Sequence, residues 1–398
     1  MDFTLPKEVD DFRRRVRAFV EDRLIPLEKD PATFDEQETI RADLLQAVRG
    51  EVKRAGLWAP QIPKQYGGQG LDIVGMAACY EEMNRSLFGP VCFNCAAPDD
   101  GTMIALNKGL PEAQKARWLQ PIIDGEVQSS FCMTEPHPGA GSDPSMMITR
   151  AEKKGDKWVV YGRKWFITGA AKAKHFILLA RTSDDPRNGL TAFLFHADQP
   201  GWQIERRIGI MGPEDHGGHC EMGFRGLEIP EENVILKPGD GLKFTQIRLG
   251  PARLTHCMRW TGLARRALEV AAAYITERKS FGIGLHQHEG VQWMLGDAAM
   301  QVDIGRLLTM RAAWLLDQGE RAQKEISMAK VVVSEALHHA VDTAIQLCGA
   351  SGYSKDLPLE WIYRYARLAR IGDGASEVHK MVLASHVLKE RKDFWSWR

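Results

Sequence analysis

Two short segments near the middle of the chain combine turn residues with side chains that can hold a polar ligand. The first, residues 131–143, reads FCMTEPHPGAGSD, and its prolines and glycines end a strand and bring backbone N–H groups to a surface. The second, residues 164–169, reads KWFITG and follows a strongly β-prone run, so the hydroxyl of Thr168 can face a ligand. Each segment taken alone is equally consistent with an ordinary β-turn.

Two other clusters contain potential metal ligands, but their spacing argues against a metal. Cys92 and Cys95 form a CxxC sequence without a second pair and without a βαβ context. His216 and His219 stand in a glycine-rich loop that lacks further ligands at a suitable spacing, which favours a structural or substrate-entrance loop. No GxGxxG sequence joins a strand to a helix, so a Rossmann nucleotide site is not supported. We predict no metal site.

The composition is that of an ordinary globular protein of 398 residues, 44% apolar and 26% charged. Basic and acidic residues both number 52, so no net charge attracts nucleic acid or an acidic membrane, and any anionic ligand needs a local site. Seven scattered cysteines favour a reducing compartment. The absence of a long apolar run and of an apolar signal segment predicts a cytoplasmic protein, or one of the mitochondrial matrix in a eukaryote.

Three regions of different character must position the two segments. Residues 1–125 have mainly helical periodicity, residues 126–240 contain short β-prone runs between turn residues, and residues 241–398 return to long helical patterns. The helices are expected over residues 36–56, 72–86, 101–108, 111–124, 253–280, 291–318, 324–348 and 375–394. This order predicts an α+β protein with an N-terminal helical domain, a small antiparallel β-sandwich or barrel, and a C-terminal four-helix bundle.

One predicted bundle helix, residues 291–318, carries an apolar stripe that we expect to face the bundle core. The stripe consists of Leu295, Val302, Ile304, Leu308, Met310 and Leu315.

These features, taken in order, resemble the acyl-CoA dehydrogenase family. The family's flavin-contacting patterns, TEPxxGSD and WIT[NSG]G, are similar to residues 134–143 and 165–169, with two additional residues in the first loop. Further similarities are YGGQG at 66–70, ERKSFG at 277–282 and QLCGASGY at 346–353. The resemblance covers essentially the full length. It implies a domain of N-terminal helices, a middle β domain with the flavin and CoA contacts, and a bundle, with the boundaries given above.

The resemblance implies that FAD is held between the β domain and the bundle, with a neighbouring subunit completing the site. Phe166, Ile167 and Thr168 would lie against the isoalloxazine ring, where an aromatic side chain stacks and donors stabilise reduced flavin. Trp165 precedes Phe166, and either ring could make the stack. The residues that would line the dinucleotide are Phe131, Met133, Thr134 and Ser142.

Other cofactor contacts implied by the resemblance come from the bundle. Arg278 would pair with the pyrophosphate of a partner subunit's FAD, although its own sequence context is that of a solvent-exposed cation at a helix end. Gln346, Gly349 and Ala350 would approach the adenosine end of FAD, where small residues let the backbone come close to the cofactor. The remaining implied contacts are Phe281, His288, Ala375 and Glu377.

The family's reaction removes a proton α to a thioester carbonyl, which requires a carboxylate in a dry site with its pKa raised toward the working pH. The family's base motif, YEGTxQ, is matched by residues 371–379, which place Asp373 at the base position. Asp is shorter than Glu by about 1.5 Å, and Gly372 and Gly374 could let the backbone shift. Alternatively, Asp373 caps a helix ahead of Ser376. Ala252 stands where some relatives carry the base instead.

The resemblance also implies substrates and partners. Arg253 would lie near the base and the thioester, and Ser142 and Gly374 near the CoA side. His256 on the same helix could either reach the site or only pack, and packing is favoured. Asp373 and residues 250–259 most resemble the subgroup that animals fuse to a kinase-like domain. This implies medium-chain, long-chain or branched acyl-CoA substrates, some 4-hydroxylated, an electron-transfer flavoprotein as acceptor, and a homo-oligomer (dimer or dimer of dimers). The alternatives are a nitroalkane or acyl-CoA oxidase of the same fold and a non-catalytic acyl-CoA-binding homologue.

Overall fold

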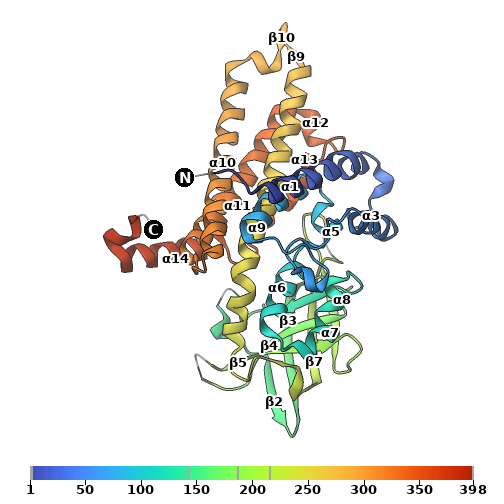
Figure 1. The fold of residues 1–398 in the computed structure, drawn as a ribbon, viewed down its shortest axis with the longest axis vertical. Helices are drawn as coiled ribbons and strands as arrows, with labels where there is room; N and C mark the ends of the chain where they lie inside the picture. Colours follow the sequence, from blue (N-terminus) through green and yellow to red (C-terminus); the bar gives the residue numbers. More distant parts are fainter. Residues whose placement is uncertain (1–2, 142, 186–187, 215–216, 397–398) are drawn as a thin grey trace.

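The computed structural model describes residues 3–141, 143–185, 188–214 and 217–396. Figure 1 shows the long bundle helices at the top, the N-terminal helices packed against their middle, and the β domain at the bottom. Helix α9 (Gly241–Glu277) runs from the β domain to the far end of the bundle. The predicted α+β architecture is thus confirmed. Among the described residues, no helix has the length and apolar character that a membrane crossing requires.

The N-terminal part consists of short helices joined by turns. They are α1 (Lys7–Phe19) with a π-helical continuation (Val20–Leu24), α2 (Ile25–Leu27), α3 (Ala42–Arg54), α4 (Ile73–Met83), α5 (Gly89–Cys92), α6 (Asp99–Gly109), α7 (Glu112–Trp118) and α8 (Gln120–Ile123). Two predicted helices are wrong in extent. Helix α3 starts later than residue 36, because the Asp35 carboxylate accepts the N–H groups of Gln37 and Thr39 and holds a turn. The helix predicted over 111–124 is divided near Pro121, which lacks the N–H of a continuous helix.

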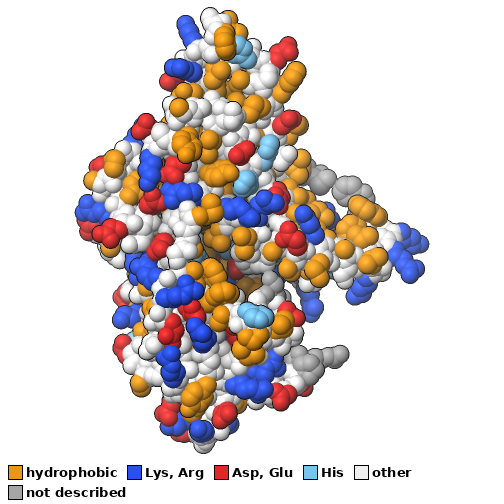
Figure 2. All heavy atoms as spheres, turned by 180° about the vertical axis from the view of Figure 1, so that it is seen from behind, with side chains coloured by type: hydrophobic (Ala, Val, Ile, Leu, Met, Phe, Trp, Pro, Cys, Tyr) orange, Lys and Arg blue, Asp and Glu red, His pale blue; other side chains and the backbone are white. Residues whose placement is uncertain are grey.

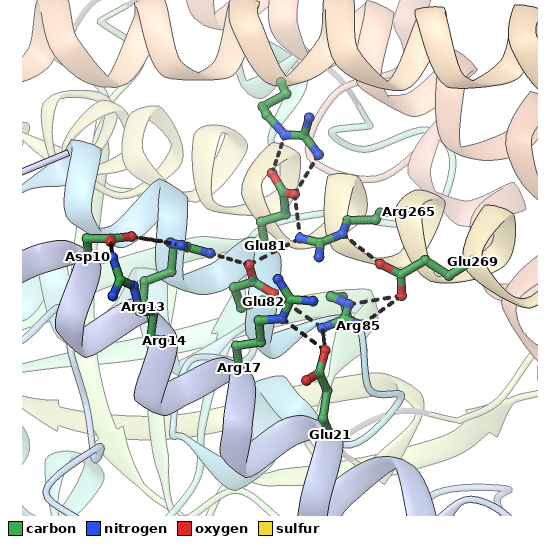
Figure 3. A network of polar contacts seen from close by, with 11 residues as sticks. Asp10, Arg13, Arg14, Arg17, Glu21, Glu81, Glu82, Arg85, Arg265 and Glu269 are labelled. Atoms are coloured by element: carbon green, nitrogen blue, oxygen red, sulfur yellow. Dashed lines mark hydrogen bonds and ion pairs between the residues drawn. The ribbon is translucent and has the colours of Figure 1, made fainter. Parts of the chain in front are cut away.

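A network of charges fastens the N-terminal helices to the bundle (Figure 3). Glu82 of α4 accepts hydrogen bonds from Arg13 of α1 at 2.7 Å and from Arg265 of α9 at 3.2 Å. Its neighbour Glu81 accepts two bonds from Arg306 of α10 (Glu289–Asp317), at 2.8 and 2.7 Å. Because these partly buried pairs are shared among helices of both parts, they fix how the N-terminal helices sit on the bundle.

The β domain is a single mixed sheet of eight strands within the described residues. The strands are β1 (Ser129–Cys132), β2 (Arg150–Lys154), β3 (Lys157–Thr168), β4 (His175–Arg181), β5 (Leu190–His196), β6 (Trp202–Ile208), β7 (His219–Pro230) and β8 (Val234–Ile235). Most neighbours are antiparallel, as predicted, but β4 pairs in parallel with both β1 and β2. The β2–β3 hairpin supplies the long connection that the parallel β1–β4 pair needs.

In the C-terminal part, α9, α10 and α11 (Gln323–Cys348) pack on one another, and α14 (Ser376–Glu390) packs on α11. A short hairpin, β9 (Lys279–Ser280) and β10 (Ile283–Gly284), joins α9 to α10. Helices α12 (Ala350–Tyr353) and α13 (Leu359–Ala369) follow α11 and were not predicted. The predicted start of the first bundle helix at Arg253 is also wrong, since α9 continues through Pro251. Its contacts with α6 and β5 outweigh the local cost of a proline.

The apolar stripe predicted for the core side of α10 is only partly buried: Val302 is buried, but Ile304 is 51% exposed. Small residues form most of the buried face, namely Ala298, Val302, Gly305, Thr309, Ala312 and Ala313. A Cβ added at Gly305 would lie 3.0 Å from Val333 of α11, so the two helices are too close for large side chains. Leu295, Leu308, Met310 and Leu315 of the predicted stripe are half-buried against the core, whereas several other large apolar side chains of α10 are exposed. We call Trp293, Met300, Ile304, Leu307 and Trp314 the outer stripe of α10.

Candidate active site

The two ligand-binding segments found in the sequence lie side by side and are joined by a buried ion pair. Lys164 Nζ donates to Glu135 Oε1 at 2.9 Å and to the Met133 carbonyl at 2.8 Å, and both charged side chains are 0% exposed. The Trp165 N–H donates to the Thr134 carbonyl at 2.9 Å. Burial raises the pKa of Glu135, but the Lys164 charge and several donated hydrogen bonds outweigh it, so this pKa lies below its ordinary value.

A bulge in β3 turns an aromatic side chain outward in the second segment. The pairing of β3 with β7 shifts between Lys164 and Ile167, where Phe166 adopts a φ of 51° and is 46% exposed. Bulges re-aim side chains and are frequent next to functional sites. Thr168 Oγ1 lies 3.0 Å from His219 Nδ1. Ile167 is buried in the β core, so only its backbone can reach a cofactor.

Asp373 lies in the turn between α13 and α14, where its φ is 52°. Its Oδ2 is 2.9 Å from His256 Nε2, and Arg253 donates to its main-chain carbonyl at 3.0 Å. The N-cap of α14 is Ala375, so the alternative prediction that Asp373 caps this helix is wrong. Of the two possibilities left open for His256, both are found: it stacks on Trp260, with ring centroids 4.8 Å apart, and it reaches the carboxylate as well.

Positive charges converge on Asp373, whose side chain is 27% exposed. Burial raises the pKa of this carboxyl, but the His256 hydrogen bond and the charges of Arg248 and Arg253 outweigh it and hold the pKa well below its ordinary value. Lys330 of α11 also lies close, donating to the Gly374 carbonyl at 2.9 Å. The predicted rise of the Asp373 pKa is therefore wrong, because several cations that are distant in the sequence meet here.

Arg248 is a site residue that the sequence interpretation missed. Its side chain is buried, its guanidinium carbon lies 4.3 Å from the centroid of the Phe131 ring, and its Nε has no hydrogen-bond partner among the described residues. It connects the end of β1 with Asp373. The signal was present: Arg248, His256 and Arg259 recur on one face of a helix. This pattern can be recognised only if the predicted helix includes residue 248, and the predicted helix started at Arg253.

A second group of predicted cofactor residues lies at the opposite end of the bundle. Arg278 ends α9 and is exposed, and Phe281 at the tip of the β9–β10 hairpin is 96% exposed. His288 Nε2 is 3.2 Å from the Ser280 carbonyl. The residues Gln346, Gly349 and Ala350 are exposed at the junction of α11 and α12. Figure 1 shows β9, β10 and α12 toward the top and the β domain at the bottom, so one chain does not bring this group to the β domain.

The remaining predicted residues surround the start of α14. Gly374 has a φ of 104°, and a Cβ there would lie 3.0 Å from His379 Nε2, so this turn requires glycine. Ala375 is half-buried, and Glu377 in the first turn of α14 is exposed. Ser142, like His216 of the histidine pair, lies outside the described residues. Within the described ranges, no group of three or more His, Cys, Asp or Glu side chains could hold a metal ion.

The edge where the two segments meet suits a planar aromatic cofactor. The Phe166 ring is exposed whereas Trp165 is half-buried, so Phe166 is the ring available for stacking. The Thr168 hydroxyl and the unmatched Arg248 Nε are donors for the nitrogen and oxygen atoms of such a ring system. These residues fit FAD.

Comparison with known proteins gives the family. Three family descriptions match: "Acyl-CoA dehydrogenase, N-terminal domain" over residues 6–126, "middle domain" over 130–227, and "C-terminal domain" over 239–388. A protein of Mycobacterium tuberculosis named probable acyl-CoA dehydrogenase FadE2 is 33% identical, over 98% of each chain. Human acyl-CoA dehydrogenase family member 11 is 36% identical over 95% of this chain but 50% of its own length. The chain thus spans about half the length of this and similar animal relatives.

Solved structures have the same fold. The glutaryl-coenzyme A dehydrogenase glutaryl-CoA complex superposes with a TM-score of 0.86 at 30% identity, covering 100% of this chain and 99% of that one. Butyryl-CoA dehydrogenase from Megasphaera elsdenii superposes with a TM-score of 0.85 at 28% identity, covering 98% and 100% of the two chains. The chain therefore belongs to the acyl-CoA dehydrogenase family. A structure described as the FAD complex of PigA, 24% identical with a TM-score of 0.88, has the same fold.

Proposed function

We propose that the protein is an FAD-dependent dehydrogenase that converts an acyl-CoA thioester into the 2-enoyl-CoA. The observation that carries this proposal is the Asp373 carboxylate, which caps no helix and is held by His256 at a site that Arg248 links to Phe131. In this role Asp373 accepts the proton that leaves the α carbon. When bound, FAD supplies the acceptor for the β hydrogen and its electron pair.

The surrounding residues bind and orient the reactants. Phe166 and Thr168 hold the flavin ring at the end of β3, and the Lys164–Glu135 pair keeps that strand end against the loop after β1. Arg253 anchors the Asp373 main chain and places a positive charge near the thioester. We assign the backbone at Gly374 to the CoA side of the site.

The pH dependence follows from the low pKa of Asp373. Only the ionised carboxylate accepts a proton, so kcat/KM should stay high down to acidic pH and fall only below about pH 3.9, the ordinary value of an aspartate. The measurement is flavin bleaching by limiting acyl-CoA over a pH series, because kcat/KM reports the free enzyme. Inside the complex, an acyl chain displaces water from the carboxylate and raises its pKa, so the kcat profile should fall at a higher pH. A kcat/KM profile that falls near neutral pH contradicts this assignment.

The test of the proposed function is spectroscopic. The purified protein should be yellow, and acyl-CoA should bleach its flavin under anaerobic conditions. In a separate assay in air, acyl-CoA should produce no peroxide. Peroxide formed with a nitroalkane or an acyl-CoA would identify an oxidase of the same fold instead. A protein that binds acyl-CoA without bleaching would be a non-catalytic homologue.

The proposed substrates are medium-chain, long-chain or branched acyl-CoAs, with 4-hydroxylated chains among them, and the proposed electron acceptor is an electron-transfer flavoprotein. The similarity to human acyl-CoA dehydrogenase family member 11 supports an acyl-CoA as the substrate class. A panel of acyl-CoAs that differ in length, branching and hydroxylation, scored by bleaching rate, identifies the preferred chain. We propose a cytoplasmic location in a bacterium, or the mitochondrial matrix in a eukaryote.

We further propose a homo-oligomer, a dimer or a dimer of dimers, in which each FAD site uses two subunits. The outer stripe of α10 and the exposed Phe281 ring are large apolar surfaces of the kind that a protein interface covers. Figure 2 shows hydrophobic side chains over the helical upper part and around a hollow where that part meets the β domain. Within one chain these cofactor residues lie far from the β domain, but a second copy can bring its own to this chain's flavin. They are Arg278, Gln346, Gly349 and Ala350.

Replacing Arg278 by alanine should weaken FAD retention about tenfold to a hundredfold, because a hydrogen bond to a charged group contributes about 1.5–3 kcal/mol. The measurement is the FAD-to-protein ratio after dialysis at several protein concentrations. Lys279→Ala, which removes the neighbouring exposed cation, is the matched control and should retain FAD. Equal retention by both variants argues against a pyrophosphate contact of Arg278.

A further inference from the structure

A row of polar side chains runs from Asp373 into the N-terminal helices. His256 Nε2 lies 2.9 Å from Asp373 Oδ2, and His256 Nδ1 lies 3.1 Å from Nη2 of Arg259. Arg259 Nη1 is paired with the Asp100 carboxylate of α6 and donates to the Cys95 carbonyl at 2.6 Å. Arg259 is 3% exposed and Asp100 is fully buried, so water does not substitute for either partner.

The donors and acceptors in this row determine the tautomer of His256. A guanidinium has only N–H donors, so the imidazole nitrogen that faces Arg259 has to be an acceptor. A neutral imidazole with Nδ1 as acceptor carries its single proton on Nε2. The Nε2–H then points at Asp373, whose ionised carboxylate only accepts. A second proton on Nδ1 would place a positive ring against the positive Arg259.

We propose that His256 is the positioning residue of this site: Arg259 holds it in the neutral Nε2–H form, and it donates to Asp373 Oδ2, leaving Oδ1 for the substrate proton. This inference rests on the proposed function for its catalytic meaning. The stack on Trp260, with an interplanar angle of 19°, fixes the plane of the imidazole. Asp100 in turn fixes Arg259, so the orientation of the base depends on a residue of the N-terminal helices.

The electrostatic surroundings agree with a neutral ring. Burial lowers the pKa of His256, the Asp373 hydrogen bond raises it, and the Arg259 charge lowers it, with a net decrease. The charged and titratable groups that face Asp373 and His256 are Asp100 on α6, Arg248, Arg253 and Arg259 on α9, Lys330 on α11 and His379 on α14.

Two substitutions separate positioning from packing. His256→Phe keeps a ring on Trp260 but removes both nitrogens, whereas His256→Gln keeps an N–H for Asp373 and an oxygen for Arg259. His256→Phe should lower kcat about tenfold to a hundredfold, the cost of a misplaced catalytic group, with little change in KM. Its kcat/KM profile should fall at a higher pH than that of the wild type, because the lost donor raises the Asp373 pKa. His256→Gln should restore most of kcat and the wild-type profile.

Full activity of His256→Phe, or equal impairment of both variants with unshifted pH profiles, overturns the proposal. A second measurement does not require turnover: nitrogen-15 NMR of the histidine-labelled holoenzyme, with His256 assigned as the signal lost in either variant. The expected signal is a neutral Nε2–H imidazole that does not titrate through the neutral range. An Nδ1–H tautomer or a doubly protonated ring overturns the proposal even if no acyl-CoA bleaches the flavin. The expected signal in a protein without turnover supports it, while refuting the proposed function.

Discussion

Asp373→Asn should slow flavin reduction by acyl-CoA about 100-fold to 10,000-fold, the contribution that a positioned general base makes. The amide matches the carboxylate in size but cannot accept the α proton. FAD content should be unchanged, because the side-chain hydrogen bond of Asp373 is made to His256 of α9. The measurement is the rate of anaerobic bleaching at saturating acyl-CoA in a stopped-flow instrument.

The matched control is Asp156→Asn, which makes the same chemical change in the exposed turn between β2 and β3 and should leave the rate unaltered. Undiminished reduction by Asp373→Asn would mean that another group removes the proton. Asp373→Glu tests reach: the additional bond moves the carboxylate by about 1.5 Å. Because this shift would disturb the hydrogen bond between His256 Nε2 and the carboxylate, we expect this variant to reduce flavin more slowly than the wild type.

Lys164→Met should destabilise the fold by about 3–5 kcal/mol, because removal of one partner leaves the other as an uncompensated buried charge. Both Lys164 and Glu135 are 0% exposed, so water cannot replace the lost contact. The variant should also lose FAD readily, since the pair joins the two segments that face the cofactor. Unfolding in urea, followed by tryptophan fluorescence, measures the first effect, and the flavin-to-protein ratio measures the second.

Lys174→Met, at an exposed position of the same domain, is the control and should unfold near the wild-type midpoint. Adding Glu135→Gln to Lys164→Met should recover part of the lost stability, because it removes the buried carboxylate that no longer has a charged partner. The folded-state pKa of Glu135 lies below the ordinary value of about 4.3, so its contribution is present above that pH and is lost as the pH falls through the folded-state value. A Lys164→Met midpoint equal to that of the wild type would refute the assigned role of this ion pair.

The sequence by itself determined the features that depend on neighbouring residues. The prolines and glycines of residues 131–143 end β1, the β-prone run after residue 157 forms β3, and periodicity locates most of the long helices. The order of these features was enough to indicate the α+β architecture. The same order, with Asp373 standing at the place of the usual glutamate, led to the candidate base.

Only the tertiary structure decided what depends on contacts between distant segments. Packing against α6 and β5 carries α9 through Pro251, which brings Arg248 beside Asp373 and reverses the expected direction of the Asp373 pKa. The close approach of α10 and α11 buries small residues between them, and several large apolar side chains of α10 remain exposed. Periodicity finds the faces of a helix but not which face is covered, because coverage depends on the distance to the neighbouring helix. The pKa of a carboxyl is likewise decided by the tertiary structure, because it depends on which cations folding brings near it.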